Sequence, residues 1–111
     1  MNSEIKYTEH FKKEYKRLAK KYVSLKDDML ALIKTLRKKP TSGTSLGSNT
    51  YKIRLAVSSK GKGKSGGARI ITYFVDKDNT VYLLSIYDKS EEAAITDSEI
   101  KNILKEVENN K

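Results

Sequence analysis

Four basic side chains are spaced so that three β-strands would bring them onto one surface. In the run YKIRLAV, Lys52 and Arg54 are two residues apart, so both project from the same face of an extended strand. Arg69 opens the next β-type run, ARIITYFV, and Lys89 follows the end of the last one, TVYLLSIY. The pattern predicts a concave cationic patch suited to a polyanion such as a phosphate chain.

A glycine-rich basic loop joins the first two of these strands and would crown the patch with Lys60, Lys62 and Lys64. Its glycines would allow the backbone to approach a phosphate chain closely. Hardly any acid balances the bases on this face, which favours a bound polyanion because the charges otherwise repel one another. The alternatives are a solvated sheet face and a hairpin loop without fixed structure.

The segment GKGKSG within this loop satisfies G-x-G-x-x-G, but its context excludes a nucleotide site. A P-loop requires glycine where this chain has Ser58, and both nucleotide motifs require the glycines to open a helix. Here a strand follows. A kinase glycine loop is also excluded, because the chain has neither H-R-D nor D-F-G.

Residues for other common kinds of catalysis are scarce. The chain has no cysteine, so a thiolate metal site, a disulfide and a Cys nucleophile are all excluded. The single histidine, His10, falls on a predicted helix, where we expect it to be exposed or half-packed rather than catalytic. The acidic residues sit in turns and helix caps rather than in a ligand cluster, so we expect neither a metal nor another cofactor.

Length and charge bound the class of protein. We expect one domain over the 111 residues, 1–111, with a modest core. Lys and Arg number 23 against 14 Asp and Glu, and this net charge of +9 favours a polyanion or an acidic protein partner. No apolar run approaches the roughly 20 residues that span a bilayer, and the N-terminus lacks a signal-peptide core. We therefore expect a cytoplasmic protein without membrane contact.

The N-terminal half predicts a short strand, SEIKYT, followed by a helical hairpin. Thr8 can cap the first helix, EHFKKEYKRLAKKY. Ser24 with Asp27 resembles a capping box for a second helix, which Pro40 would stop. The side chains expected in the core of this half are those of Tyr7, Phe11, Tyr15, Leu18, Tyr22, Met29, Leu30, Ile33 and Leu36.

The C-terminal half predicts a polar loop over residues 41–50, then three strands and a helix. The last two strands are joined by a tight turn from Asp76 to Asn79. Thr96 and Glu99 form a capping box that opens the final helix. The resulting order, β-α-α-β-β-β-α, predicts an α+β fold in which a helical hairpin packs on a mainly antiparallel sheet with a C-terminal helix.

The stretch YKIRLAVSSKGKGKSGGARIITYF followed by VYLLSIYDKSE resembles the RelE/ParE superfamily of bacterial toxins, and within it the HigB-like branch. The resemblance extends over residues 7–104 and rests on the order and spacing of the motifs. It implies a RelE-like type II toxin that enters the ribosomal A site and cleaves translated messenger RNA without a metal. It also implies inhibition by a cognate acidic antitoxin, HigA-like and DNA-binding.

The resemblance also implies roles for the basic patch. Lys52 and Arg54 occupy the positions that act on RNA, Arg69 that of the arginine at the scissile phosphate, and Lys89 that of the lysine after the last strand. The arginine that some members place next is Ser90 here. The tyrosine that RelE carries near the start of the last helix is absent, and its place falls around residues 95–96.

RNA cleavage of this kind uses the 2′-OH as nucleophile, so the protein must orient the backbone and stabilise charge on the phosphorane. Arginine suits that task, and Lys52, beside Arg54 and Arg69, is the candidate base because neighbouring cations favour a neutral lysine. Tyr73 and Tyr87 border the basic region as a stacking platform, as substitutes for the missing tyrosine, or as plain packing. The alternatives are a ParE-like inhibitor of DNA gyrase without nuclease activity and a non-enzymatic RNA- or ribosome-binding module.

Overall fold

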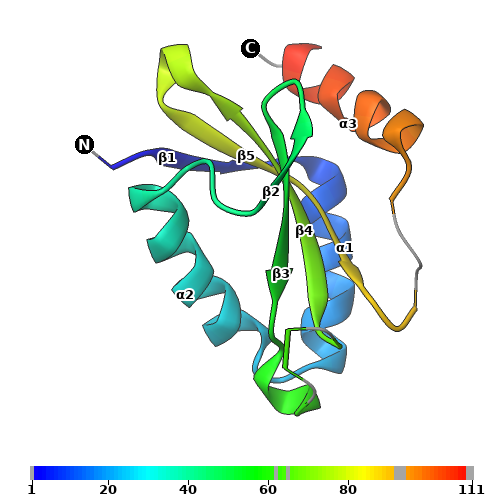
Figure 1. Cartoon of the computed structure of the whole chain (residues 1–111). Helices are drawn as coiled ribbons and strands as arrows, with labels where there is room; N and C mark the ends of the chain where they lie inside the picture. The colour runs from blue at the N-terminus through cyan, green and yellow to red at the C-terminus, as the bar shows by residue number, and fades with distance from the viewer. Residues whose placement is uncertain (1, 62, 65, 92–94, 110–111) are drawn as a thin grey trace.

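A five-stranded sheet with the order β1-β5-β4-β3-β2 organises the chain (Figure 1). The computed structural model describes residues 2–61, 63–64, 66–91 and 95–109. The strands are β1 (Glu4–Tyr7), β2 (Thr44–Gly47), β3 (Thr50–Leu55), β4 (Ala68–Val75) and β5 (Thr80–Asp88). β1 runs parallel to β5, and the other neighbouring pairs are antiparallel. The expectation of a mainly antiparallel sheet is therefore confirmed.

Helices cover both faces of this sheet. The helices α1 (Glu9–Lys21) and α2 (Leu25–Lys38) pack on one face, in a cluster that includes Leu18, Leu36 and Ile70. The helix α3 (Asp97–Asn109) packs on the other face, against Ile71 and Leu84 (Figure 1). The predicted α+β layout is confirmed. Within the described ranges, no helix combines the length and apolar character needed to cross a membrane.

Two of the three helix caps predicted from the sequence are present in the structure. The hydroxyl of Thr8 accepts from the backbone N–H of Phe11 at 3.0 Å, as predicted for α1. Thr96 and Glu99 form the expected reciprocal capping box at the start of α3. The capping box predicted for Ser24 is wrong, because the Ser24 side chain makes no capping hydrogen bond in α2.

The polar loop predicted over residues 41–50 is wrong over Thr44–Gly47, which forms β2 and pairs with the start of β3. All four residues of β2 are exposed, so the strand carries no apolar alternation that a sequence pattern could detect. Ser48 and Asn49 turn the chain with positive φ values of 51° and 64°. The predicted turn from Asp76 to Asn79 is confirmed as the short 3-10 helix η2 (Asp76–Asp78) followed by left-handed Asn79.

Two side chains expected in the core are exposed, and three more, those of Tyr15, Tyr22 and Ile33, are half-buried. Tyr7 is 43% exposed and Leu30 is 51% exposed. Both lie at an apolar depression between α1 and α2, lined also by Phe11, Tyr15 and Met29. Strand alternation for Tyr7 and helical spacing for Leu30 placed both beside the core, at its exposed edge.

Gly67, which precedes β4, allows β3 and β4 to approach each other closely. A Cβ at this position would lie 2.1 Å from the backbone oxygen of Leu55. We expect Gly67→Ala to lower the free energy of unfolding by about 3 kcal/mol, because overpacking against backbone forces the strands apart. Urea unfolding measures this change.

Gly47→Ala provides the matched control. Gly47 has a positive φ of 89°, but its Cβ would meet no atom within 4 Å. Its substitution should cost only the backbone strain of a left-handed alanine, about 1 kcal/mol. Equal losses for the two variants would contradict a close-packing role for Gly67.

Candidate functional site

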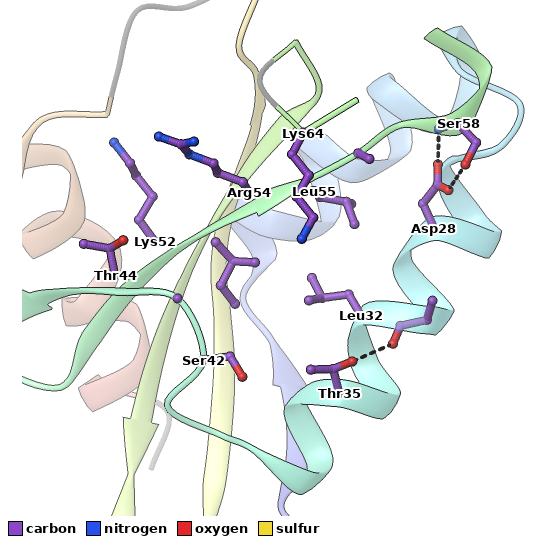
Figure 2. Close-up of a pocket in the computed structure, with 14 residues that line it drawn as sticks. Asp28, Leu32, Thr35, Ser42, Thr44, Lys52, Arg54, Leu55, Ser58 and Lys64 are labelled. Carbon is purple, nitrogen blue, oxygen red and sulfur yellow. Dashed lines mark hydrogen bonds between the residues drawn. The ribbon is translucent and has the colours of Figure 1, made fainter. Parts of the chain in front are cut away.

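The basic pair on β3 lies as the alternation predicted. Arg54 is exposed and Lys52 is half-buried, while Ile53 and Leu55 between and beside them are buried in the core. Figure 2 shows the side chains of Lys52 and Arg54 pointing in the same direction, away from α2. Two cations are thus held side by side on a regular strand, which fixes their spacing.

Arg69 lies directly across the hairpin from this pair. Its Cα is the register partner of Arg54 on β3 and of Tyr87 on β5. The residue is only 5% exposed, and its Nη1 donates to the backbone oxygens of Lys64 at 2.9 Å and Ala68 at 3.2 Å. The Arg69 guanidinium is therefore held under the basic loop, with its Nη1 bound to the carbonyl of Lys64.

A cavity of about 620 Å³ runs between α2 and β3 (Figure 2). Lys52, Arg54 and Lys64 contribute to its wall on the sheet side, and Asp28 and Ser58 contribute to the opposite end. The Lys64 side chain extends beside Leu55 in Figure 2, and the residue is exposed. The structure thus brings one predicted loop lysine to the basic strand.

Lys60 does not crown the patch, and its predicted position in the exposed loop is wrong. It ends the short 3-10 helix η1 (Ser58–Lys60), and its side chain is 7% exposed. Its Nζ lies 2.7 Å from Oδ1 of Asp88, whose side chain is 2% exposed, and 5.1 Å from the centroid of the Tyr22 ring. Lys60 is half of a buried ion pair and is not available to RNA in this arrangement.

Asp88, the last residue of β5, is the acceptor at the centre of this buried cluster. Its carboxylate accepts from Lys60, from the Tyr22 hydroxyl, and from both the backbone N–H and the hydroxyl of Ser90. Burial alone would raise the pKa of Asp88, but these hydrogen bonds outweigh it and hold the pKa well below its ordinary value. Asp88 is therefore a fully satisfied buried anion.

A second carboxylate secures η1 from the side of α2. Asp28 accepts from the backbone N–H of Ser58 at 3.0 Å, from the Ser58 hydroxyl at 2.7 Å and from the Ser24 hydroxyl at 2.8 Å. Burial acts to raise the pKa of Asp28, and the hydrogen bonds from Ser58 and Ser24 lower it below its ordinary value. The start of the basic loop is thus fixed between α2 and the end of β5.

Lys89, in the turn after β5, lies beside the other end of the basic loop. It is exposed, and its backbone N–H donates to the oxygen of Gly67 at 3.1 Å, two residues before Arg69. Glu91 follows in the same turn and accepts from Arg17 and Lys21 of α1, each at 3.0 Å. Hydrogen bonds from Arg17 and Lys21 lower the pKa of Glu91. The turn after β5 is therefore tied to both the loop and α1.

The two tyrosines near the basic region are packed. Tyr73 belongs to the cluster beneath α3, with its ring 6.4 Å from that of Tyr82, and Tyr87 is 2% exposed. Tyr87 is thus buried and Tyr73 is half-buried, and the stacking role of Tyr73 stays a prediction. Lys62 lies outside the described residues, so its predicted role is not placed. His10 is exposed on α1, as expected.

Sequence reasoning missed Asp88 and Asp28, which position the loop. Asp88 appeared to be an ordinary turn residue and Asp28 was given no role, because their partners lie far away in the chain. Lys60 precedes Asp88 by 28 residues, and Ser58 follows Asp28 by 30. One signal was available, since Asp88 directly continues a buried strand and such a carboxylate requires donors. The sequence alone does not identify which donors.

Comparisons with known proteins identify the family and the fold. The family model of the RelE toxin of the RelE/RelB toxin-antitoxin system matches residues 7–110. A free-state mutant of E. coli toxin RelE gives a TM-score of 0.64 at 16% identity, covering 95% of this chain and 97% of that one.

Two further E. coli structures match less closely. A chain of the intact RelBE toxin-antitoxin complex gives a TM-score of 0.51 at 20% identity, covering 78% of this chain and 95% of that one. The isolated RelE toxin also gives 0.51, at 17% identity, covering 93% and 97% respectively. At these identities the structural matches establish the fold.

The buried pair leads to a stability prediction. Lys60→Met should lower the free energy of unfolding by about 3–5 kcal/mol, because it leaves the buried carboxylate of Asp88 without its cation. Lys64→Met, in the same loop but exposed, should change it by at most about 0.5 kcal/mol. Urea unfolding at neutral pH compares the two variants, and similar losses would show that Asp88 does not depend on Lys60.

The pKa of Asp88 leads to a pH prediction. A carboxyl whose pKa is depressed by folding stabilises the protein above its unfolded pKa of about 3.9 and loses that contribution as the pH falls. The stability advantage of the natural protein over Asp88→Asn should therefore shrink by about 1 kcal/mol between pH 6 and pH 3. Chemical unfolding at both pH values measures it. An advantage that stays constant or grows would contradict the depressed pKa.

Proposed function

We propose a function from one premise: this chain belongs to the RelE toxin family of RelE/RelB toxin-antitoxin systems. The proposed activity is ribosome-dependent endoribonuclease cleavage of translated messenger RNA, which would arrest growth. No metal or other cofactor takes part in the proposed reaction. Messenger RNA in the ribosomal A site is the substrate, and the basic face of β3 and β4 is the site.

The observation that carries this proposal is the cross-strand arrangement of the cations. Lys52 and Arg54 project from one face of β3, and Arg54 is in register with Arg69 on β4. An antiparallel register places the facing Cβ atoms of Arg54 and Arg69 roughly 5 Å apart, so the two side chains start as neighbours on one face. A row of cations held by a regular sheet is preorganised for an RNA backbone.

The chemistry assigned to these residues follows from the reaction. The 2′-OH gives its proton to a base and attacks the adjacent phosphate, and negative charge builds on the phosphorane oxygens. The bond from phosphorus to the 5′-oxygen then breaks, which leaves a 2′,3′-cyclic phosphate and a 5′-oxygen that takes a proton from an acid, here a cationic side chain or water. Arg54, exposed and planar, is proposed to stabilise that charge, with Arg69 behind it. Lys52 is the proposed base, since it lies beside these two cations, and Lys89 supports them from the turn after β5. Lys64 is proposed to bind RNA at the cavity edge.

The rest of the biological setting is part of the same proposal. We propose a cytoplasmic, single-domain toxin of the HigB-like branch, neutralised by an acidic, DNA-binding antitoxin of the HigA-like kind. The support is the net charge of +9 and the membership in a toxin-antitoxin family. The crystal structure of the E. coli RelBE complex provides a precedent for such pairing in a protein of the same fold.

One observation favours a second candidate. Arg69 is 5% exposed and hydrogen-bonded to loop carbonyls, an arrangement that would also suit a structural arginine. A ParE-like protein that inhibits DNA gyrase without cutting RNA needs no arginine at a scissile phosphate. This candidate predicts an exposed basic surface but no transfer chemistry.

Substitution of Arg54 tests the proposal. With purified protein and programmed ribosomes, Arg54→Ala should lower the rate of messenger RNA cleavage by about 10²–10³-fold, as expected for losing one preorganised charge at a developing anion. Arg54→Lys should retain part of the rate, because it keeps the charge but loses the planar fork. Both variants should unfold like the natural protein, since Arg54 is exposed.

Lys77→Ala is the matched control, because Lys77 is an exposed cation of η2 at the opposite end of β4. It should cleave at the natural rate. Intact messenger RNA together with blocked gyrase supercoiling would replace the proposal with the ParE-like candidate. If Lys77→Ala and Arg54→Ala lost activity equally, the effect would be one of net charge rather than of this site.

A further inference from the structure

The buried pair of Lys60 and Asp88 lies next to the basic face rather than within it. Three segments meet at the Asp88 carboxylate: the end of α1 through Tyr22, η1 through Lys60, and the turn after β5 through Ser90. Each donor comes from a different part of the chain. One carboxylate therefore fixes the relative positions of three elements.

The position of Asp88 in the sheet connects it to the site residues. It immediately precedes Lys89, and its register partner on β4 is Ala68, which immediately precedes Arg69. The Nη1 of Arg69 donates to the oxygens of Ala68 and Lys64. The loop carrying Lys64 is held at its start by Lys60, and its final residue, Gly67, accepts from the N–H of Lys89.

A buried ion pair such as that of Lys60 and Asp88 adds little net stability to a fold. Desolvating two charges costs about as much as their attraction returns, and apolar residues of similar volume often serve equally well. What an ion pair adds is a directional contact that only one register satisfies. With Ser90 and Tyr22 also bound, the carboxylate admits few alternative arrangements of the loop.

We infer that Lys60 and Asp88 are positioning residues for the basic face: their pair sets the loop carbonyl that holds the Arg69 guanidinium and the turn that carries Lys89. Neither residue touches the RNA in this account. The catalytic part of the inference rests on the proposed function, whereas the placement of Arg69 does not.

The test replaces both members of the pair at once. In Lys60→Met/Asp88→Leu no buried charge is left alone, and the freed groups of Tyr22 and Ser90 can reach water, since neither residue is fully buried. The matched control is the exposed pair on α1, in the double variant Glu9→Gln/Lys12→Met. Thermal unfolding should show that both double variants fold cooperatively.

Two readouts follow. The first is hydrogen exchange of the Arg69 guanidinium by nitrogen-15 NMR, assigned with Arg69→Lys, which should quicken by at least about tenfold in the Lys60/Asp88 variant and not in the control. The second is cleavage on programmed ribosomes, where kcat should fall by about 10–100-fold while KM stays within about threefold, because a small displacement of a catalytic group mainly slows the chemical step.

The outcomes distinguish a failure of the positioning role of Lys60 and Asp88 from a failure of the proposed function. Unchanged Arg69 exchange in a folded Lys60/Asp88 variant overturns the inference, as does an unchanged kcat despite faster exchange. If the natural protein cleaves no RNA, the proposed function fails, and Arg69 exchange alone then decides whether the pair positions that side chain.

A milder variant serves if the double variant does not fold. Tyr22→Phe removes only one of the hydrogen bonds to Asp88 and keeps the ring beside Lys60. It should shift Arg69 exchange in the same direction by a smaller factor, about two- to threefold. No shift in a folded Tyr22→Phe protein, together with an unfolded double variant, would limit the pair to stability and overturn the positioning role.

Discussion

The arrangement of the basic surface depends on one buried carboxylate. Asp88 ends β5, the strand between β1 and β4, and is almost completely removed from water, so each of its lone pairs requires a donor from the protein. The donors come from α1, from η1 and from the turn that follows β5. The regular sheet places Arg54 opposite Arg69, but the loop and turn around that sheet have no such ladder. Their positions depend on this carboxylate and on Asp28.

The distribution of charge follows from the same constraint. The chain carries an excess of nine positive charges, and three of its acids are bound to donors that lie away from β3. Asp28 and Asp88 bind loop donors, and Glu91 binds two cations of α1. Asp88 and Glu91 neutralise cations away from β3, whereas the donors to Asp28 are uncharged. The outward face of β3 keeps the charges of Lys52 and Arg54, and this inequality is what gives the molecule a basic side suited to a polyanion.

The sequence predicted the structure best where a residue interacts only with near neighbours in the chain. Thr8 and Thr96 cap their helices because a hydroxyl and an N–H three residues apart need no distant partner. Strand alternation placed Lys52 and Arg54 on one face for the same reason. Prediction failed where the partner of a residue lies far away in the chain and only the tertiary structure brings the two together. Lys60 appeared to be one of three equivalent loop lysines, and only the position of β5 shows that it is buried against Asp88.

Other errors share this origin. The strand β2 is entirely exposed and forms by pairing with the edge of β3. Its own sequence therefore has no apolar periodicity from which a strand could be predicted. Ser24 has the spacing of a capping box, but its hydroxyl is used by Asp28 and Ser59 instead. In each case a residue with a valid local role takes a different partner that the tertiary structure brings near.

The central claim is that the face of β3 and β4 carrying Lys52 and Arg54 contacts the RNA backbone. A cryo-electron microscopy structure of this protein on a ribosome programmed with messenger RNA that is 2′-O-methylated in the A-site codon tests it directly, because the blocked nucleophile preserves the complex. The account predicts the Arg54 guanidinium within roughly 3 Å of a phosphate oxygen in that codon, with Lys52 beside the methylated 2′-oxygen and the pair of Lys60 and Asp88 intact. A complex in which α1, α3 or the edge of β1 faces the messenger RNA, with Arg54 turned to solvent, would contradict it.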